Sequence, residues 1–280
     1  MDALLARTKR SLASTAVYAF LTAGALTMAI PYIWMFVTSI KPVEEIQAYP
    51  PSFFVHHPTL AAYKELFYLL PIPRYLLNSL FIAVVVTLCN VFFCSLAGYA
   101  FAKHRFKGRD KIFLLLLGAI MIPYQVNLIP GFIIVKKLGW LNSFYALIIP
   151  NITMAFGVFL CRQYIMSIPN DLIDAAKIDG CGEFTIYRLI IFPLIKPALA
   201  ALAIFTFLSQ WNSFVWPLIV IHTSAMRTVP LALSVLNSQF GTDFSVVMAG
   251  ATVVTLPVLI VFLFLQKYII QGIKMTGLKG

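Results

Sequence analysis

The chain has 280 residues, of which 61% are apolar and 11% charged, and its mean hydropathy is +0.90. Soluble domains are nearer half apolar and a quarter charged, so this composition excludes an ordinary soluble enzyme and indicates a protein surrounded by lipid. The formal net charge is +11. On a soluble protein such a charge would suggest nucleic acid, but basic loops on one side of a membrane explain it without that partner.

Six apolar segments follow one another along the chain, each long enough for a helix of about 20 residues to cross a bilayer. They cover residues 14–40, 75–102, 111–135, 141–164, 198–221 and 247–270. The first is too long for the apolar core of a signal peptide, so we expect it to remain as a span. The predicted fold class is all-α: a polytopic membrane protein with six transmembrane helices and a single transmembrane domain over residues 1–280.

Lysine and arginine gather in alternate connections, which defines a topology. They are concentrated near the N-terminus, in residues 103–111, in residues 162–196 and near the C-terminus. The positive-inside rule places these segments, and both termini, in the cytoplasm. Outer loops are then expected at residues 41–74 and 222–246. Apolar residues at helical spacing between Thr59 and Leu70 predict an amphipathic helix within the first outer loop.

The segment Met121–Pro130 contains two prolines together with Gln125 and Asn127. Proline in a membrane helix frees a carbonyl and bends the axis, so the segment predicts a broken helix near one membrane face. Its amides have two interpretations that the sequence supports equally. They either line a solute path or form hydrogen bonds between helices.

The spans lack the groups that other energy sources need. No Asp, Glu, Lys or Arg lies well inside a predicted span, which disfavours coupling to a proton gradient through an intramembrane charge. The chain has no Gly-Lys dipeptide and therefore no P-loop for nucleotide phosphates. If ATP supplies the energy, a separate subunit must bind it. We also expect no catalytic residue, no metal site and no cofactor in this chain.

The predicted cytoplasmic connection over residues 166–197 resembles two short helices joined by a glycine turn. Asn170 is expected to cap the first helix, and Leu172, Ala175 and Ala176 to share one face of it. Gly180 can adopt the left-handed conformation that ends a helix. A helix with a face of small residues suits docking to another protein, although it could instead pack against the membrane surface.

This connection resembles the "EAA" signature of binding-protein-dependent ABC importer permeases. The matching residues are Asp174, Ala175, Ala176, Asp179, Gly180, Tyr187, Ile190, Pro193 and Pro197. The sequence departs from the pattern at Asp174, where the family has Glu, at Cys181 for Ala and at Phe192 for Leu. Further stretches are similar to the second permease of carbohydrate-uptake systems: residues 39–42, 78–79, 97–102, 121–123, 137–139, 210–217 and 277–280.

The resemblance implies the type I ABC importer permease fold and a subunit of an ATP-driven importer for a sugar or oligosaccharide. The implied partners are a second permease, two ATPase subunits that bind ATP-Mg, and an extracytoplasmic solute-binding protein. The implied location is the bacterial or archaeal cell (inner) membrane. By this likeness the ATPase is coupled through Asp174, Ala175, Ala176, Asp179, Gly180, Glu183 and Pro193.

The resemblance also suggests where the solute and the binding protein make contact. Residues matching the outer loop that touches the binding protein are Asn237, Ser238, Gln239, Phe240 and Gly241. Amides and aromatic rings suit sugar hydroxyls and ring faces, and the candidates for the solute path are Gln125, Asn127, Asn151, Gln210, Trp211 and Asn212. Two other interpretations remain open: an ATP-independent secondary transporter or facilitator, and a membrane subunit that does not transport.

Overall fold

A computed structural model describes residues 2–239 and 243–276, and the side-chain environments of residues 14–236 and 243–264. Every regular element in these ranges is a helix. Four helices are long and apolar enough to cross a membrane, and the number rises to six if each of two bent helix pairs is one span. The all-α fold is therefore confirmed, and the structure is consistent with the predicted six spans.

The helices form two compact units, which are described separately. The first unit contains Met1–Leu70 and Leu236–Val253, and the second contains Pro71–Val235 and Val254–Gly280. Two helices contribute to both units: α14 (Val229–Gln239) and α15 (Phe244–Thr276).

In the first unit, α1 (Asp2–Ser39) is followed by α2 (Val43–Gln47) and α3 (Ala61–Leu69). The buried ammonium group of Lys41 donates a hydrogen bond to the carbonyl of Ser52 and lies 5.4 Å from the centroid of the Trp34 ring. These contacts fix the connection after α1. The predicted helix between Thr59 and Leu70 forms as α3, and it buries one face.

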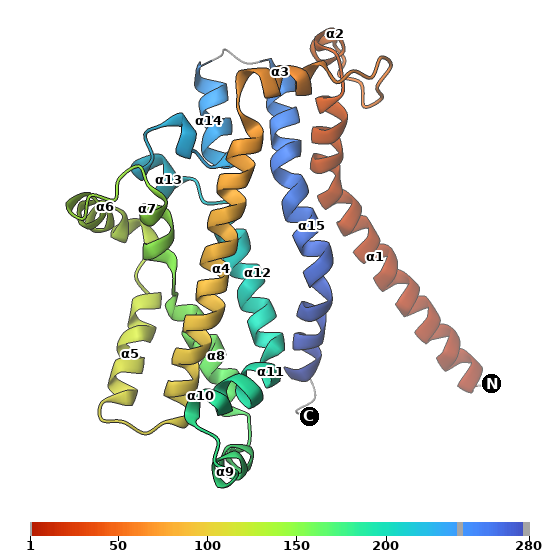
Figure 1. The fold of residues 1–280 in the computed structure, drawn as a ribbon. Helices are drawn as coiled ribbons and strands as arrows, with labels where there is room; N and C mark the ends of the chain where they lie inside the picture. The colour runs from red at the N-terminus through yellow and green to blue at the C-terminus, as the bar shows by residue number, and fades with distance from the viewer. Residues whose placement is uncertain (1, 240–242, 277–280) are drawn as a thin grey trace. The chain divides into compact units, whose positions relative to one another are not determined.

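The second unit is built around α4 (Ile72–Lys103), which packs against α8 (Ala155–Met166) and α12 (Lys196–Trp211) (Figure 1). Two glycines allow α4 and α8 to approach closely. A Cβ atom on Gly98 would lie 2.7 Å from the Cβ of Cys161 and 2.9 Å from the backbone nitrogen of Arg162. A Cβ atom on Gly157 would lie 2.8 Å from the sulfur of Cys94. Neither position has room for a larger residue without displacing its neighbours.

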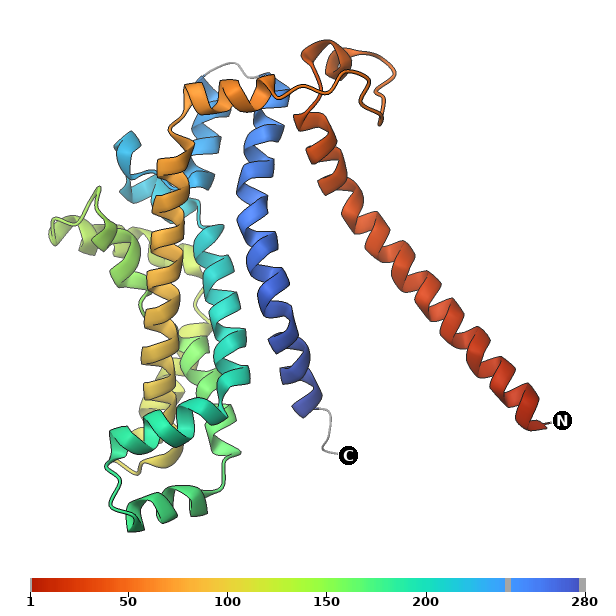
Figure 2. The same ribbon diagram turned by 45° about the vertical axis from the view of Figure 1, so that its right-hand side comes forward.

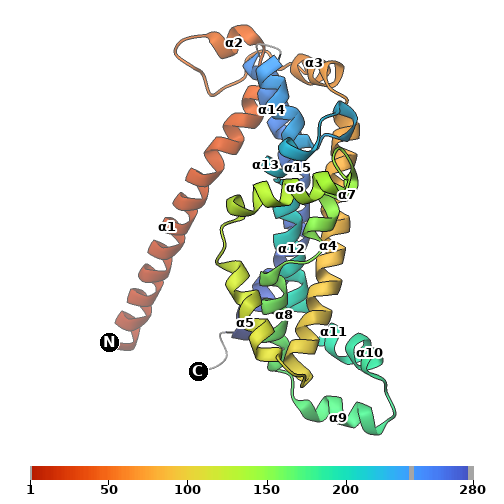
Figure 3. The same cartoon turned by 90° about the vertical axis from the view of Figure 1, so that its left-hand side faces the viewer.

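The third predicted span, 111–135, is two helices rather than one. α5 (Arg109–Ile120) ends before Pro123, a short 3₁₀ turn, η1 (Tyr124–Asn127), follows, and α6 (Leu128–Lys137) continues after a bend of 98°. Figure 3 shows α6 turned across the direction of α5. The predicted break in the proline-containing segment is present, because proline disfavours helical backbone at the residue before it.

The next two predicted spans are also interrupted. α7 (Phe144–Ile148) and the 3₁₀ turn η2 (Ile149–Asn151) precede a non-helical stretch at residues 152–154, after which α8 begins. α12 stops at Trp211, and α13 (Val215–Val220) starts after three intervening residues. The turn η4 (Ser224–Met226) follows it. The prediction of continuous spans over 141–164 and 198–221 missed both interruptions. Hydropathy is high on both sides of each break and does not record the backbone conformation.

The predicted cytoplasmic connection contains four short elements. These are α9 (Asn170–Ile178), α10 (Glu183–Ile186), a π-helical turn called η3 (Tyr187–Ile191) and α11 (Phe192–Leu194). The chain then bends by 79° into α12. Figure 2 shows α9 and α10 as two short helices, one beyond the other at the end of α4.

Candidate functional site

Helix α9 ends in the glycine turn that the sequence predicts. Gly180 has φ +79°, in the left-handed region. The backbone N–H of Cys181 donates to the carbonyl of Ala176 at 2.9 Å, and that of Gly180 to the carbonyl of Lys177 at 3.0 Å. These bonds satisfy carbonyls that the helix end would leave without a partner. No atom lies within 4 Å of a Cβ built on Gly180, so backbone conformation, not space, favours glycine here.

One residue of the predicted face of α9, Ala176, is buried instead of exposed. Ile173 and Ala176 are buried in the core of the second unit. Leu172 is 46% exposed, Ile178 is 87% exposed, and Ala175 is exposed as well. The predicted face of Leu172, Ala175 and Ala176 is therefore divided, because Ala176 points with Ile173 into the core. We call Leu172, Ala175 and Ile178 the outer face of α9.

Asn170 does not cap α9 with its side chain. Pro169 occupies the capping position, and no side-chain capping bond forms. The amide oxygen of Asn170 instead accepts a hydrogen bond of 2.8 Å from the ammonium group of Lys103, which also donates to the carbonyl of Ile168. A cation at the end of α4 therefore competes for the group that was expected to cap the helix.

Three residues at four-residue spacing on α4 hold this connection. Ser95 and Tyr187 share a hydroxyl–hydroxyl hydrogen bond of 2.7 Å. The hydroxyl of Tyr99 donates to the carboxylate of Glu183 at 2.9 Å, and Lys103 binds the start of α9. Residues four apart lie on the same helix face, so one stripe of α4 contacts α9, α10 and η3. We call Ser95, Tyr99 and Lys103 the α4 ladder.

Glu183 joins three elements. Its carboxylate accepts from the ammonium group of Lys177 on α9 at 2.9 Å, from Tyr99 on α4, and lies 3.5 Å from Nε2 of His104. The hydrogen bond from Lys177 lowers the pKa of Glu183, and the hydrogen bond from Tyr99 and the nearby His104 lower it further. Desolvation opposes this effect and raises the pKa. Half-exposed ion pairs contribute little to stability, so the cluster matters mainly for fixing geometry.

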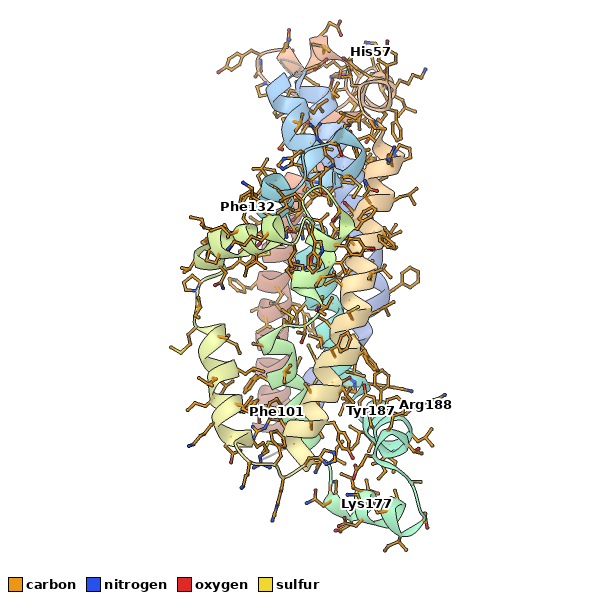
Figure 4. All side chains as sticks on the ribbon, turned by 60° about the vertical axis from the view of Figure 1, so that its left-hand side comes forward. His57, Phe101, Phe132, Lys177, Tyr187 and Arg188 are labelled. Carbon is orange, nitrogen blue, oxygen red and sulfur yellow. The ribbon has the colours of Figure 1, made fainter. Side chains whose placement is uncertain are left out.

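The remaining predicted coupling residues are accessible. Asp174 and Asp179 are exposed, and their side chains make no hydrogen bond or ion pair among the described residues. Pro193 is exposed at the start of α11, before the bend into α12. Figure 4 shows Lys177 of α9 and Tyr187 and Arg188 of η3 at the same end of the unit as Phe101 of α4. The structure thus brings the predicted residues to one end of the second unit.

A separate cavity of about 430 Å³ lies within the second unit, and we call it the polar cavity after the amides and hydroxyls in its otherwise apolar lining. It is lined by Asn90, Tyr124, Asn151, Thr153, Met154, Thr206, Ser209, Gln210, Ser213, Phe214, Val215 and Trp216. Of the six predicted solute-path residues, Asn151 and Gln210 line it.

The other four predicted solute-path residues lie outside the cavity lining. Trp211 is 1% exposed and donates through its indole N–H to the carbonyl of Val254 at 3.2 Å, which makes it part of the helix packing. Asn212 donates to the carbonyl of Leu208 at 2.9 Å, within its own helix end. Gln125 and Asn127 are exposed in η1. The positions of the helix breaks decide which of the predicted amides line the cavity.

Sequence reasoning missed Asn90. It lies in α4, is 1% exposed, and donates hydrogen bonds of 2.6 Å to the carbonyl of Asn151 and 3.0 Å to that of Val86. Its bond to Asn151 satisfies a carbonyl at the break before α8. An amide in the middle of a largely apolar span is a signal that could have found it, because such groups are costly in lipid.

The predicted contact with a binding protein falls at the edge of what the structure describes. Asn237, Ser238 and Gln239 belong to the last turn of α14, but their side chains are not described. Phe240 and Gly241 lie outside the described residues.

Comparison with known proteins gives a consistent result. Residues 4–275 match the family described as "binding-protein-dependent transport system inner membrane component". The chain is 41% identical over 207 residues to the arabinooligosaccharides transport system permease protein AraQ of Bacillus subtilis, with 74% of each chain covered. It is 35% identical to the trehalose/maltose transport system permease protein MalG of Thermococcus litoralis, over 92% of this chain and 95% of that one.

The fold is also found in a solved structure. A chain of a bacterial ABC transporter involved in the import of the acidic polysaccharide alginate superposes with a TM-score of 0.81 at 23% identity, over 91% of this chain and 96% of that chain. The family match covers nearly the whole sequence. This chain therefore belongs to the binding-protein-dependent transport system inner membrane components, the permease subunits of ABC importers.

Proposed function

We propose that this chain forms part of the translocation path of a sugar or oligosaccharide importer and receives the energy of ATP through its connection at residues 166–197. The accessible outer face of α9 carries this proposal. Leu172, Ala175 and Ile178 present an apolar stripe that no other described residue covers. An exposed apolar stripe next to polar residues is a common mark of a protein interface.

The charges around the stripe support a protein partner on the same surface. Asp174 and Asp179 are exposed without an intramolecular partner in the described part of the chain. They are therefore free to accept hydrogen bonds or pair with basic groups of an ATPase. The ATP-Mg would be bound entirely by that separate subunit.

The α4 ladder provides a route from the outer face of α9 to the solute path. Tyr99 and Lys103 bind the connection, and Asn90 lines the polar cavity on the same helix. At 1.5 Å per residue, the 13 residues from Asn90 to Lys103 span about 20 Å. A rigid α4 would thus convert a displacement of α9 into a displacement of one cavity wall.

The proposed partners follow from family membership and from the relatives. They are a second permease, two ATPase subunits and an extracytoplasmic solute-binding protein, which residues 237–241 would meet. Both termini and the 166–197 connection would lie in the cytoplasm. The sugar class is supported by the names of the relatives AraQ and MalG.

The experiment is affinity purification of this chain from its native host in mild detergent, with mass spectrometry of the proteins that accompany it. The proposal predicts an ATPase and a second permease. The purified complex should hydrolyse ATP faster when a sugar-loaded binding protein is added. Recovery of the chain alone, or only with itself, would contradict the ATP-coupled function and favour a facilitator.

A further inference from the structure

Three interruptions of helical backbone meet at the polar cavity. Tyr124 follows the break after α5, Thr153 lies in the break before α8, and Ser213 lies in the break after α12. The first two breaks fall inside candidate membrane spans, and the third directly follows the candidate span that ends at Trp211. Irregular backbone at membrane depth is tolerated where it is buried in protein or lines a hydrated cavity. Because all three breaks line one cavity, the cavity is a consistent feature of the fold and not an accidental gap in the packing.

Polar side chains from the end of α12 and the break after it line part of the cavity and have no hydrogen-bond partner in the described part of the chain. The side chains of Ser209, Gln210 and Ser213 make no hydrogen bond among the described residues, although Asn90 and Asn151, which also line the cavity, are hydrogen-bonded. Two hydroxyls and one primary amide thus present both donors and acceptors to the cavity. Such groups cost free energy at membrane depth unless water or a solute pairs with them.

No ionisable Asp, Glu, Lys, Arg or His is among the described residues that line the cavity. A carboxylate or sulfonate in such a site would lose its hydration without gaining a counter-charge. A neutral sugar loses less, because its hydroxyls can exchange water for amide and hydroxyl partners. The rings of Tyr124 and Phe214 also line the cavity, and aromatic faces suit the apolar face of a sugar ring.

We propose that this cavity is a subsite for an uncharged saccharide, held on this chain itself by Ser209, Gln210 and Ser213. The volume of about 430 Å³ lies within the range of about 300–1,000 Å³ typical of small-molecule sites. The proposal rests on the proposed function and narrows it, since family membership alone does not separate neutral from acidic sugars. The structurally similar alginate transporter imports an acidic polysaccharide.

The first test uses the complete transporter in proteoliposomes with its binding protein. Arabinotriose, lactose and maltotriose serve as neutral probes, and trigalacturonate serves as the acidic probe. Gln210→Ala and Ser209→Ala should each lower uptake of the transported neutral probe at least fivefold, while ATP hydrolysis still responds to the loaded binding protein. Gln163→Ala, an exposed amide on α8 outside the cavity, should leave uptake unchanged. Wild-type uptake in both cavity variants would overturn the proposal without affecting the coupling function.

A second test does not depend on variants that alter transport. Ser209→Cys is nearly isosteric, and its alkylation by a maleimide can be located by mass spectrometry in the assembled complex. At least one neutral probe should slow alkylation at position 209 severalfold, and trigalacturonate should not. Gln163→Cys, at an exposed position on α8 outside the cavity, reports general accessibility and should react at a constant rate. Protection by trigalacturonate, or by no probe, would overturn the assignment.

Discussion

The hydroxyl of Tyr99 on α4 donates a hydrogen bond of 2.9 Å to the carboxylate of Glu183 on α10, which lies 84 residues further along the chain. Glu183 also accepts from Lys177 on α9 at 2.9 Å. One carboxylate thus ties the exposed helix to the long helix that reaches the polar cavity. In the proposed mechanism the main role of this bond is to transmit movement of α9 to α4, not to stabilise the fold.

Replacing Tyr99 by Phe tests this bond while keeping the ring. Tyr99 is buried and its ring packs 6.0 Å from that of Tyr187, so Phe should preserve the packing. The loss of a hydrogen bond to a charged group, worth about 1.5–3 kcal/mol at most, should lower uptake severalfold per ATP hydrolysed. Tyr68→Phe, at an exposed site on α3, is the control. Equal ratios of uptake to hydrolysis in both variants would exclude Tyr99 from the coupling route.

Lowering the pH should break the contacts of the Glu183 carboxylate with Lys177 and Tyr99 within a defined pH range. Since the hydrogen bond from Lys177, together with Tyr99 and His104, lowers the pKa of Glu183, the contact is fully present above the ordinary value of 4.5 and is lost as pH falls through the lowered value. Glu183→Gln should reproduce the acid state at pH 7. At pH 7 the backbone amides of α9 should exchange hydrogen faster in Glu183→Gln than in the wild type. In the wild type, after correction for the intrinsic pH dependence of exchange, the same acceleration should appear only below about pH 4.5. Slow exchange in the variant would argue against the cluster.

The close contact of α4 and α8 predicts a stability difference between two glycines. Gly98→Ala places a Cβ 2.7 Å from the Cβ of Cys161 and 2.9 Å from a backbone nitrogen. Such overpacking costs about 1–3 kcal/mol, which should lower the melting temperature in detergent by several degrees. At Gly118, in α5, a Cβ meets no atom within 4 Å, so Gly118→Ala should leave melting unchanged or raise it. A Gly98→Ala protein that melts like the wild type would contradict the packing described here.

The turn after α9 predicts a second glycine pair. Gly180 has φ +79°, which costs a non-glycine residue about 1–2 kcal/mol, whereas Gly182 has φ −71° and its Cβ position is free of contacts. Gly180→Ala should therefore reduce ATP-driven uptake with the protein still inserted, and Gly182→Ala should reduce it less. Gly180→Asn should fall between them, since Asn tolerates the left-handed region better than Ala. An uptake assay in membranes with matched protein levels ranks the three, and unchanged uptake in Gly180→Ala would count against the coupling role.

Sequence patterns predicted the fold well where one physical signal dominates. Long apolar runs located the membrane segments, and Gly180 marked the end of α9, because each depends on local composition or conformation. The breaks at 152–154 and 212–214 were missed. The first depends on a neighbouring helix, since Asn90 of α4 satisfies the carbonyl of Asn151. Trp211 was assigned to the solute path because of its type, but its orientation toward Val254 is a tertiary effect.

The same reasoning explains the mixed outcome in α9. Helical spacing placed Leu172, Ala175 and Ala176 together, but a stripe of that width can face the core with one edge and the surroundings with the other. Ile173 and Ala176 are three residues apart and so lie on the same side of the helix, and both are buried in the core. The prediction that Asn170 caps α9 was wrong, because its amide oxygen accepts a hydrogen bond from Lys103, 67 residues away in the sequence. No local pattern could reveal that partner.

The central claim is that the outer face of α9 docks on an ATPase. The most direct measurement is the amount of ATPase that copurifies with Ala175→Trp, compared with the wild type and with Lys107→Trp, an exposed site in the loop between α4 and α5. We expect Ala175→Trp to keep the second permease but lose most of the ATPase, and Lys107→Trp to keep both. Wild-type amounts of ATPase on Ala175→Trp, with normal stimulation of ATP hydrolysis, would contradict the account.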